Sequence, residues 1–182
     1  FRWQTGGLQA FLNQCGDGAV GADRLRAGAQ DGCIAGLPGQ GGSVGGWSLY
    51  AHEGKLKYCF NFFGIEHYIT SANEPIPAGK HQVRMEFAYD GGGLAKGGDV
   101  TLYYDGKPVG AGRVEKTIPM GYSADEACDF GSDTGSPASP DYGPTGNRFT
   151  GEIEWVQLDI GEDSHDHLIT PEERFNLAMA RQ

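Results

Sequence analysis

The chain has 182 residues, 31 of them glycine, and a formal net charge of −10. This length suits a single domain, and 38% hydrophobic residues is enough for a packed core, which argues against a globally disordered chain. The negative charge disfavours nucleic acid and anionic membrane surfaces as partners, and no apolar run approaches the roughly 20 residues that cross a bilayer.

Residues 1–29 carry the weakest structural signal. Leu8 to Leu12 form a short apolar run in a segment otherwise rich in Gly, Ala and Asp. This pattern is consistent with an edge strand, a short helix or an arm. We therefore treat residues 1–29 as a divergent N-terminal segment that packs on the main domain.

A first hairpin is predicted after Cys33. Residues 47–51 form a short strand, residues 52–55 form a turn with Gly54 where a positive φ is easiest, and residues 56–63 return. Alternation predicts one apolar face on the returning strand and a second face with Lys57, Cys59 and Asn61. The apolar face consists of Leu56, Tyr58, Phe60 and Phe62.

The clearest strand signal is at residues 80–90, where apolar and polar side chains alternate. Residues 99–104 alternate again, and Asp105-Gly106 then predicts a hairpin whose second strand lies within residues 108–118. The apolar phase of the 80–90 strand contains His81, Val83, Met85, Phe87 and Tyr89.

The last strand is predicted at residues 147–160, where two apolar phases occur. A β-bulge near Trp155 would reconcile them, or both faces are covered. Residues 170–173 (TPEE) then form a helix start, with Thr170 as N-cap and a glutamate closing the capping box. The sequence thus predicts an all-β fold: an antiparallel β-sandwich (a concanavalin A-like jelly roll) over residues 30–169, with a short C-terminal α-helix at 170–182 docked on it.

The stretches WSLYAHEGKLKYCFNF, PIPAGKHQVRMEFAYDGGG and GGDVTLYYDGKPVG resemble the hairpins of laminin-G and concanavalin A-like jelly rolls. Over residues 30–182, these stretches together with SADEACDFGSDTGSP and LDIGEDSHDHLITPEERFNLAMARQ are similar to the C-terminal region of long bacterial arylsulfatases. The resemblance implies the jelly-roll fold and an accessory role, either packing on a catalytic sulfatase-type domain or binding glycans. It does not imply sulfatase activity, because no cysteine or serine begins the C/S-x-P-x-R motif of that catalytic domain.

The acidic stretch at residues 125–143 allows two interpretations. Asp125, Glu126, Asp129 and Asp133 offer oxygen ligands for calcium, the one cofactor that the sequence suggests. Their spacing departs from a dedicated calcium loop, so the alternative is a long polar connection that crosses one edge of the sandwich. A second candidate metal set, Asp163, His165 and His167, lies in a polar linker and offers too few ligands for a structural site.

The four cysteines (Cys15, Cys33, Cys59 and Cys128) contain no C-x-x-C pair, which excludes a local zinc ribbon and leaves the disulfide state open. No signal-peptide core is visible, and the compartment stays open between periplasmic, secreted and cytoplasmic.

Catalytic motifs are weak. Glu152 and Glu154 are the nearest approach to the carboxylate pair of jelly-roll glycosidases, but the third acid of that pattern is missing. No G-x-S-x-G elbow occurs.

Exposed aromatic rings are the better candidates for a ligand site, since their faces stack on sugar rings: Trp47, Tyr68, Tyr103 and Tyr142. Tyr103 opposes the apolar phase of its strand and is therefore expected to face outward. The alternative is that most of these rings fill the core. The sequence favours a non-catalytic module with carbohydrate as its candidate ligand, with a structural or oligomeric interaction protein and a small jelly-roll glycosidase as alternatives.

Overall fold

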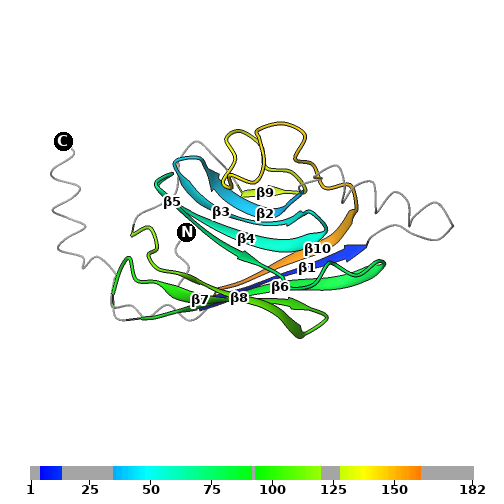
Figure 1. The fold of residues 1–182 in the computed structure, drawn as a ribbon, viewed down its shortest axis with the longest axis horizontal. Helices are drawn as coiled ribbons and strands as arrows, with labels where there is room; N and C mark the ends of the chain where they lie inside the picture. Colours follow the sequence, from blue (N-terminus) through cyan, green and yellow to red (C-terminus); the bar gives the residue numbers. More distant parts are fainter. Residues whose placement is uncertain (1–4, 14–34, 92, 120–127, 161–182) are drawn as a thin grey trace.

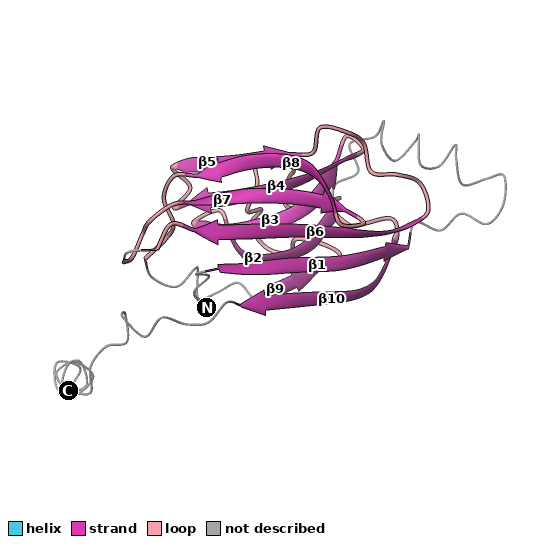
Figure 2. Ribbon diagram, turned by 90° about the horizontal axis from the view of Figure 1, so that it is seen from below, coloured by secondary structure: helices cyan, strands magenta, loops and turns pink. Residues whose placement is uncertain are grey.

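The computed structural model describes residues 5–13, 35–91, 93–119 and 128–160. Within them the chain forms two five-stranded antiparallel sheets that pack face to face (Figures 1 and 2). The first sheet has the order β10 (Glu152–Ile160), β1 (Thr5–Asn13), β6 (Lys80–Tyr89), β7 (Gly98–Tyr104) and β8 (Lys107–Val114). The second sheet has the order β5 (Glu66–Ser71), β4 (Lys55–Phe62), β3 (Gly45–His52), β2 (Ala35–Gly42) and β9 (Cys128–Phe130). The predicted antiparallel β-sandwich is confirmed.

The core lies between the two sheets and follows the period of two that β-strands impose. On β6 the inward residues Val83, Met85 and Phe87 are buried, whereas the residues between them are partly exposed. The same alternation holds on β7, where Val100 and Leu102 are fully buried. The core of the second sheet comes mainly from β3 and β4, through Trp47, Leu49, Leu56, Tyr58 and Phe60.

The sandwich is closed on one side, where the edge strands β5 and β8 meet. A Cβ added at Gly110 would lie 2.6 Å from the Ser71 carbonyl oxygen, and one at Gly112 would overlap the Thr70 hydroxyl. Two glycines in β8 therefore permit the backbones of the two sheets to approach closely.

Both predicted hairpin turns are present. Glu53 and Gly54 have φ angles of 51° and 73°, and Asp105 and Gly106 have 47° and 80°. Two successive positive φ angles define the type I′ turn, whose twist matches that of the strands it joins. The Asp105 carboxylate also accepts a hydrogen bond from the Gln82 backbone N–H at 2.8 Å, which ties the β7–β8 turn to β6.

A pH-dependent contribution to stability is expected where this turn meets β6. His81 Nδ1 lies 2.6 Å from Asp105 Oδ2. This hydrogen bond raises the pKa of His81 above its ordinary value and, together with the Gln82 N–H, lowers that of Asp105. A raised histidine pKa stabilises the fold below the unfolded value near 6.5 and loses that effect as pH rises through the folded pKa. A lowered aspartate pKa stabilises above the unfolded value near 3.9 and loses that effect as pH falls through the folded pKa.

We therefore expect His81→Gln to destabilise the protein by a few tenths of a kcal/mol at about pH 5.5, since the pair is largely exposed, and by less at about pH 8.5. Urea unfolding at the two pH values measures this difference. His67→Gln, on the exposed side of β5, is the matched control. An equal loss at both pH values for His81→Gln would contradict the assignment.

Several elements differ from the sequence expectations. Residues 5–13, for which an edge strand, a short helix or an arm were the options, form an inner strand between β10 and β6. The predicted bulge near Trp155 is confirmed, because Trp155 pairs with Phe11 and Ile153 pairs with Leu12, which leaves Glu154 as the extra residue. The predicted C-terminal helix and the Asp163, His165 and His167 set lie outside the described residues. Among the described residues, no helix is long and apolar enough to cross a membrane.

Candidate functional site

The two sheets differ in what covers their outer faces. The connection from β9 to β10 crosses the outer face of β3 and β4, and Tyr142 closes a small buried cluster with Tyr50 and Cys59. The Tyr142 hydroxyl is hydrogen-bonded to the Ser48 hydroxyl at 2.8 Å, and the Cys59 thiol lies 3.6 Å from the Ala138 carbonyl oxygen. The connection was expected to cross one edge of the sandwich; it instead covers a face of the second sheet (Figure 1).

Charged groups fasten this connection to β3 and β4. Lys57 Nζ donates to Asp141 Oδ2 at 2.8 Å, and the Tyr50 hydroxyl donates to the same oxygen at 2.9 Å. Burial acts to raise the pKa of Asp141, but these hydrogen bonds and the positive charges of Lys57 and His52 hold it below its ordinary value. Burial also raises the pKa of the Cys59 thiol to about 12. Cys59 and Cys128 are both free thiols, and a buried thiol with a raised pKa is a poor nucleophile.

Asp129 and Asp133 accept hydrogen bonds from groups of the same acidic stretch. Asp129 accepts hydrogen bonds from the Thr134 backbone N–H at 2.6 Å and the Thr134 hydroxyl at 2.7 Å. The buried Asp133 accepts from the Tyr142 hydroxyl at 2.5 Å and from the Ala138 N–H at 3.1 Å. Nowhere in the described part of the chain do three His, Cys, Asp or Glu side chains gather as a metal site.

The predicted calcium site also requires Asp125 and Glu126, which lie outside the described residues. It therefore stays a prediction. Thermal melting with calcium and with a chelator measures whether this ion stabilises the protein.

Three of the four aromatic candidates do not present a ring to a ligand. Trp47 is 2% exposed and lies in the main core, and Tyr142 is buried under the connection described above. Both were predicted as ligand-binding residues; the strand phase turns the Trp47 ring inward, and the connection buries the Tyr142 ring, as the alternative of core burial expected. Tyr68 packs partly against the core at the end of β5, and its hydroxyl donates to Glu66.

Tyr103 alone has the expected orientation. It is partly exposed on the outer face of the first sheet, between the buried residues Leu102 and Tyr104. Its neighbours on this face come from β6, β7 and β10. We call this face the platform and define it by Gln82, Arg84, Glu86, Thr101, Tyr103, Trp155 and Gln157. No segment within the described ranges crosses it (Figures 1 and 2).

The centre of the platform is a compact polar group. The Arg84 guanidinium lies 4.1 Å from the centroid of the Tyr103 ring, a cation–π arrangement, and forms an ion pair with Glu86 at 2.6 Å. The Tyr103 hydroxyl donates to Glu86 at 2.7 Å. This hydrogen bond to a carboxylate raises the pKa of Tyr103 above its ordinary value. The three side chains hold one another in place before any ligand arrives.

Trp155 is a second aromatic residue of the platform, and sequence reasoning missed it. The bulge at Glu154 shifts the strand phase, so that Ile153 and Val156 both pack towards the core while Trp155 faces outward at 39% exposure. By register, Trp155 is three strand spacings and two residues away from Tyr103. This corresponds to about 16 Å at ordinary sheet dimensions. The double phase of residues 147–160 was the sequence signal that could have identified it.

The carboxylate pair considered for glycoside hydrolysis is not assembled. Glu154 occupies the bulge and forms an ion pair with Lys80 at 2.6 Å. Glu152 sits further along β10, opposite Asn13. Both glutamates are exposed, and the third acid of the glycosidase pattern is missing beside them.

A shallow pocket lies beside the platform sheet, at the end of β9. It has a volume of about 380 Å³ and is lined by Phe130, Gly131, Ser132, Arg148, Phe149, Gly151 and Ile153. The Phe149 N–H donates to the Gly131 carbonyl oxygen at 2.7 Å, which joins its two walls. Its lining offers one cation and no carboxylate.

Comparison with known proteins gives no family assignment. No protein-family model matches the chain, and no curated protein matches it. Among solved structures, it is similar to the heptameric SAP-like pentraxin from Limulus polyphemus, at 10% sequence identity and a TM-score of 0.45. The match covers 86% of this chain and 64% of the pentraxin chain, so the chain spans less than two thirds of the length of that protein.

Proposed function

We propose that this protein is a non-catalytic β-sandwich module that binds an oligosaccharide across the platform of the first sheet. The observation that carries the proposal is the pair of outward aromatic rings, Tyr103 and Trp155, on a face that no described segment crosses. The opposite sheet cannot serve in this way, because the connection from β9 to β10 covers its outer face.

The chemistry of the platform suits neutral sugars. Aromatic faces stack on the C–H faces of pyranose rings, and the polar edges of Tyr and Trp tolerate water. Amide, hydroxyl and carboxylate groups of Gln157, Thr101 and Glu86 can donate to or accept from sugar hydroxyls. The charge of Arg84 is balanced by Glu86, so the centre of the platform does not select strongly for acidic sugars. A separation of about 16 Å between the rings favours an extended chain over a single sugar.

The absence of catalysis is part of the proposal. Hydrolysis of a glycosidic bond normally needs two carboxyl groups that face each other across the bond. The acid at the centre of the platform, Glu86, is engaged by Arg84 and Tyr103, and the ion pair of Glu154 with Lys80 supports a structural role for that acid. An accessory role beside a catalytic domain stays a prediction from the sequence, since no protein-family model matches the chain.

The proposal predicts that Tyr103→Ala abolishes or weakens oligosaccharide binding by about ten-fold or more, since one stacked ring contributes on the order of 1–1.5 kcal/mol. A glycan array of neutral and uronate-containing oligosaccharides identifies the ligand, and calorimetric titration measures the loss. Tyr103→Phe keeps the ring and removes only the hydrogen bond to Glu86, so it should retain most of the affinity.

Phe130→Ala is the matched control, because Phe130 is an exposed aromatic residue on β9 of the other sheet. Its affinity should equal that of the wild type. No binding to any glycan, or a tight dimer by light scattering that dissociates on Tyr103→Ala, would overturn the proposal; the dimer would favour the oligomeric interaction protein.

A further inference from the structure

The two ends of the sandwich carry turns of opposite chemistry. At one end the tight turns are Glu53-Gly54 and Asp105-Gly106, which are polar and ordinary for type I′ turns. At the other end, Val44 in the β2–β3 turn is 66% exposed, and Ile65 in the β4–β5 turn is 76% exposed. Phe63 in the same turn is exposed as well. We call Val44, Phe63 and Ile65 the tip patch.

Phe63 and Gly64 have φ angles of 54° and 69° and so form a type I′ turn as well, but an aromatic residue is unusual at its first central position. Phe63 has a φ of 54°, in the left-handed region that Gly and Asn favour and that is costly for a bulky side chain. Its ring lies edge to face with Phe62, at a centroid separation of 4.9 Å, instead of entering the core. A strained backbone that presents an apolar side chain to solvent is a reason to look for a function.

A fully buried residue holds the two apolar turns together. Asn61 Nδ2 donates to the Gly42 carbonyl oxygen at 2.8 Å, and Asn61 Oδ1 accepts from the Gly64 N–H at 2.7 Å. The turns also touch directly, since a Cβ at Gly64 would lie 2.5 Å from the Ser43 carbonyl oxygen. The tip patch is therefore pre-organised, and a partner would not have to order it.

The β6–β7 loop at the same end presents a further apolar side chain, Leu94. Polar contacts hold this loop: the Tyr89 hydroxyl donates to the Gly93 carbonyl oxygen at 2.5 Å and accepts from the Lys96 N–H at 3.0 Å. Thr117 donates through its N–H and its hydroxyl to the Lys96 carbonyl oxygen. Leu94 is thus carried on a braced loop.

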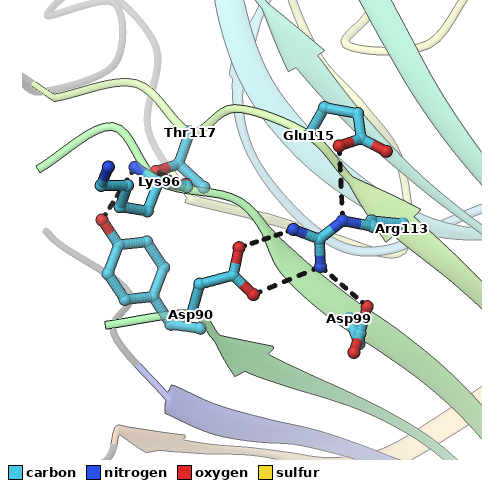
Figure 3. Close-up of polar contacts among 7 residues, drawn as sticks. Asp90, Lys96, Asp99, Arg113, Glu115 and Thr117 are labelled. Carbon is cyan, nitrogen blue, oxygen red and sulfur yellow. Dashed lines mark hydrogen bonds and ion pairs between the residues drawn. The ribbon is translucent and has the colours of Figure 1, made fainter. Parts of the chain in front are cut away.

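An arginine at the base of the loop completes the bracing. Arg113 forms ion pairs with Asp90 at 2.6 Å, Asp99 at 2.9 Å and Glu115 at 3.3 Å (Figure 3). These contacts join the two ends of the loop to β8. Because three acids surround Arg113, its positive charge is not available to an anionic partner.

We propose that the tip patch and Leu94 insert into the interface of an electrically neutral lipid bilayer. Their side chains are of the types that enter the hydrocarbon region favourably. They lie on three turns, and four partly exposed side chains offer far less than the roughly 800 Å² per partner that a stable protein interface buries. The Lys96 and Lys116 side chains at the base can extend towards the headgroups. The net charge of −10 opposes binding to anionic lipid, so the surface is phosphatidylcholine-like.

The test is co-sedimentation of the full chain with phosphatidylcholine vesicles, with and without a fraction of anionic phosphatidylserine. We expect binding to neutral vesicles that changes little between low and high salt, because apolar insertion is not screened. The anionic fraction should weaken binding. Ile65→Ser should lower the partition coefficient about ten-fold, and Val44→Ser with Ile65→Ser should abolish it.

Ile69→Ser is the matched control, since Ile69 is 40% exposed on β5 but lies outside the turn, and its binding should equal that of the wild type. Circular dichroism checks that each variant is folded. No binding of the wild type to neutral vesicles, an equal loss for Ile69→Ser, or a change of oligomeric state on Ile65→Ser in the absence of lipid would overturn the proposal. The last outcome would assign the tip patch to self-association.

Discussion

Replacing Trp47 by alanine is expected to lower the free energy of unfolding by about 3–5 kcal/mol, the largest effect of any single change considered. The side chain is 2% exposed and stacks near Tyr58, with ring centroids 6.5 Å apart. Its removal leaves a cavity in the layer between the sheets, because β3 is the central strand of the second sheet and is held on both sides. Urea unfolding followed by circular dichroism measures the loss.

The matched control is the same substitution at Trp155. That ring is 39% exposed on the platform, so Trp155→Ala should cost less than about 1 kcal/mol in stability while it weakens oligosaccharide binding. Trp47→Phe should cost far less than Trp47→Ala, because most of the volume is kept. If Trp47→Ala left stability unchanged and removed binding, the sequence-based assignment of Trp47 as a ligand residue would be right and the buried position wrong.

The contrast between the two tryptophans shows what the sequence could and could not predict. Strand alternation is reliable where each strand is half buried and unbroken, and it identified the strands that became β4, β6 and β7 together with the outward orientation of Tyr103. It fails at a bulge, since one inserted residue reverses the phase and therefore the face on which Trp155 lies. It also says nothing about which layer covers a face, which is why Tyr142 was misjudged.

Four strands, β1, β2, β5 and β9, were not assigned from the sequence, and for three of them the reason can be identified. β2 (AGLPGQGG) has almost no side chains whose alternation could be read, and its place in the sheet is set by pairing with β3 and β9. β1 contains a Leu8-to-Leu12 run that is too short to separate helix from strand. β9 lies within the acidic stretch, where three residues form a strand only because β2 offers a free edge. In each case tertiary pairing outweighs local propensity.

Replacing Asp133 by alanine is expected to destabilise the protein by about 3 kcal/mol, because two hydrogen bonds to a buried carboxylate are lost and their donors stay buried. Asp133 is 5% exposed, and its backbone is also bound by Asn147, which donates through Nδ2 to the Asp133 carbonyl oxygen at 2.7 Å. Asp129→Ala is the matched control: its carboxylate also accepts two hydrogen bonds, but it lies nearer to solvent and should cost under about 1 kcal/mol.

A second experiment tests why Asp133→Ala destabilises the protein, independently of how large the loss is. If Asp133 holds the covering connection on β3 and β4, its loss should expose Cys59 to a thiol reagent faster than it unfolds the core, and mass spectrometry can follow the labelling of that cysteine. A double-mutant cycle with Tyr142→Phe should show coupling, since the Tyr142 hydroxyl donates to Asp133 and is also hydrogen-bonded to the Ser48 hydroxyl. Labelling of Cys59 only in step with global unfolding would mean that the connection and the sandwich form one cooperative unit, and that Asp133 acts on the fold as a whole.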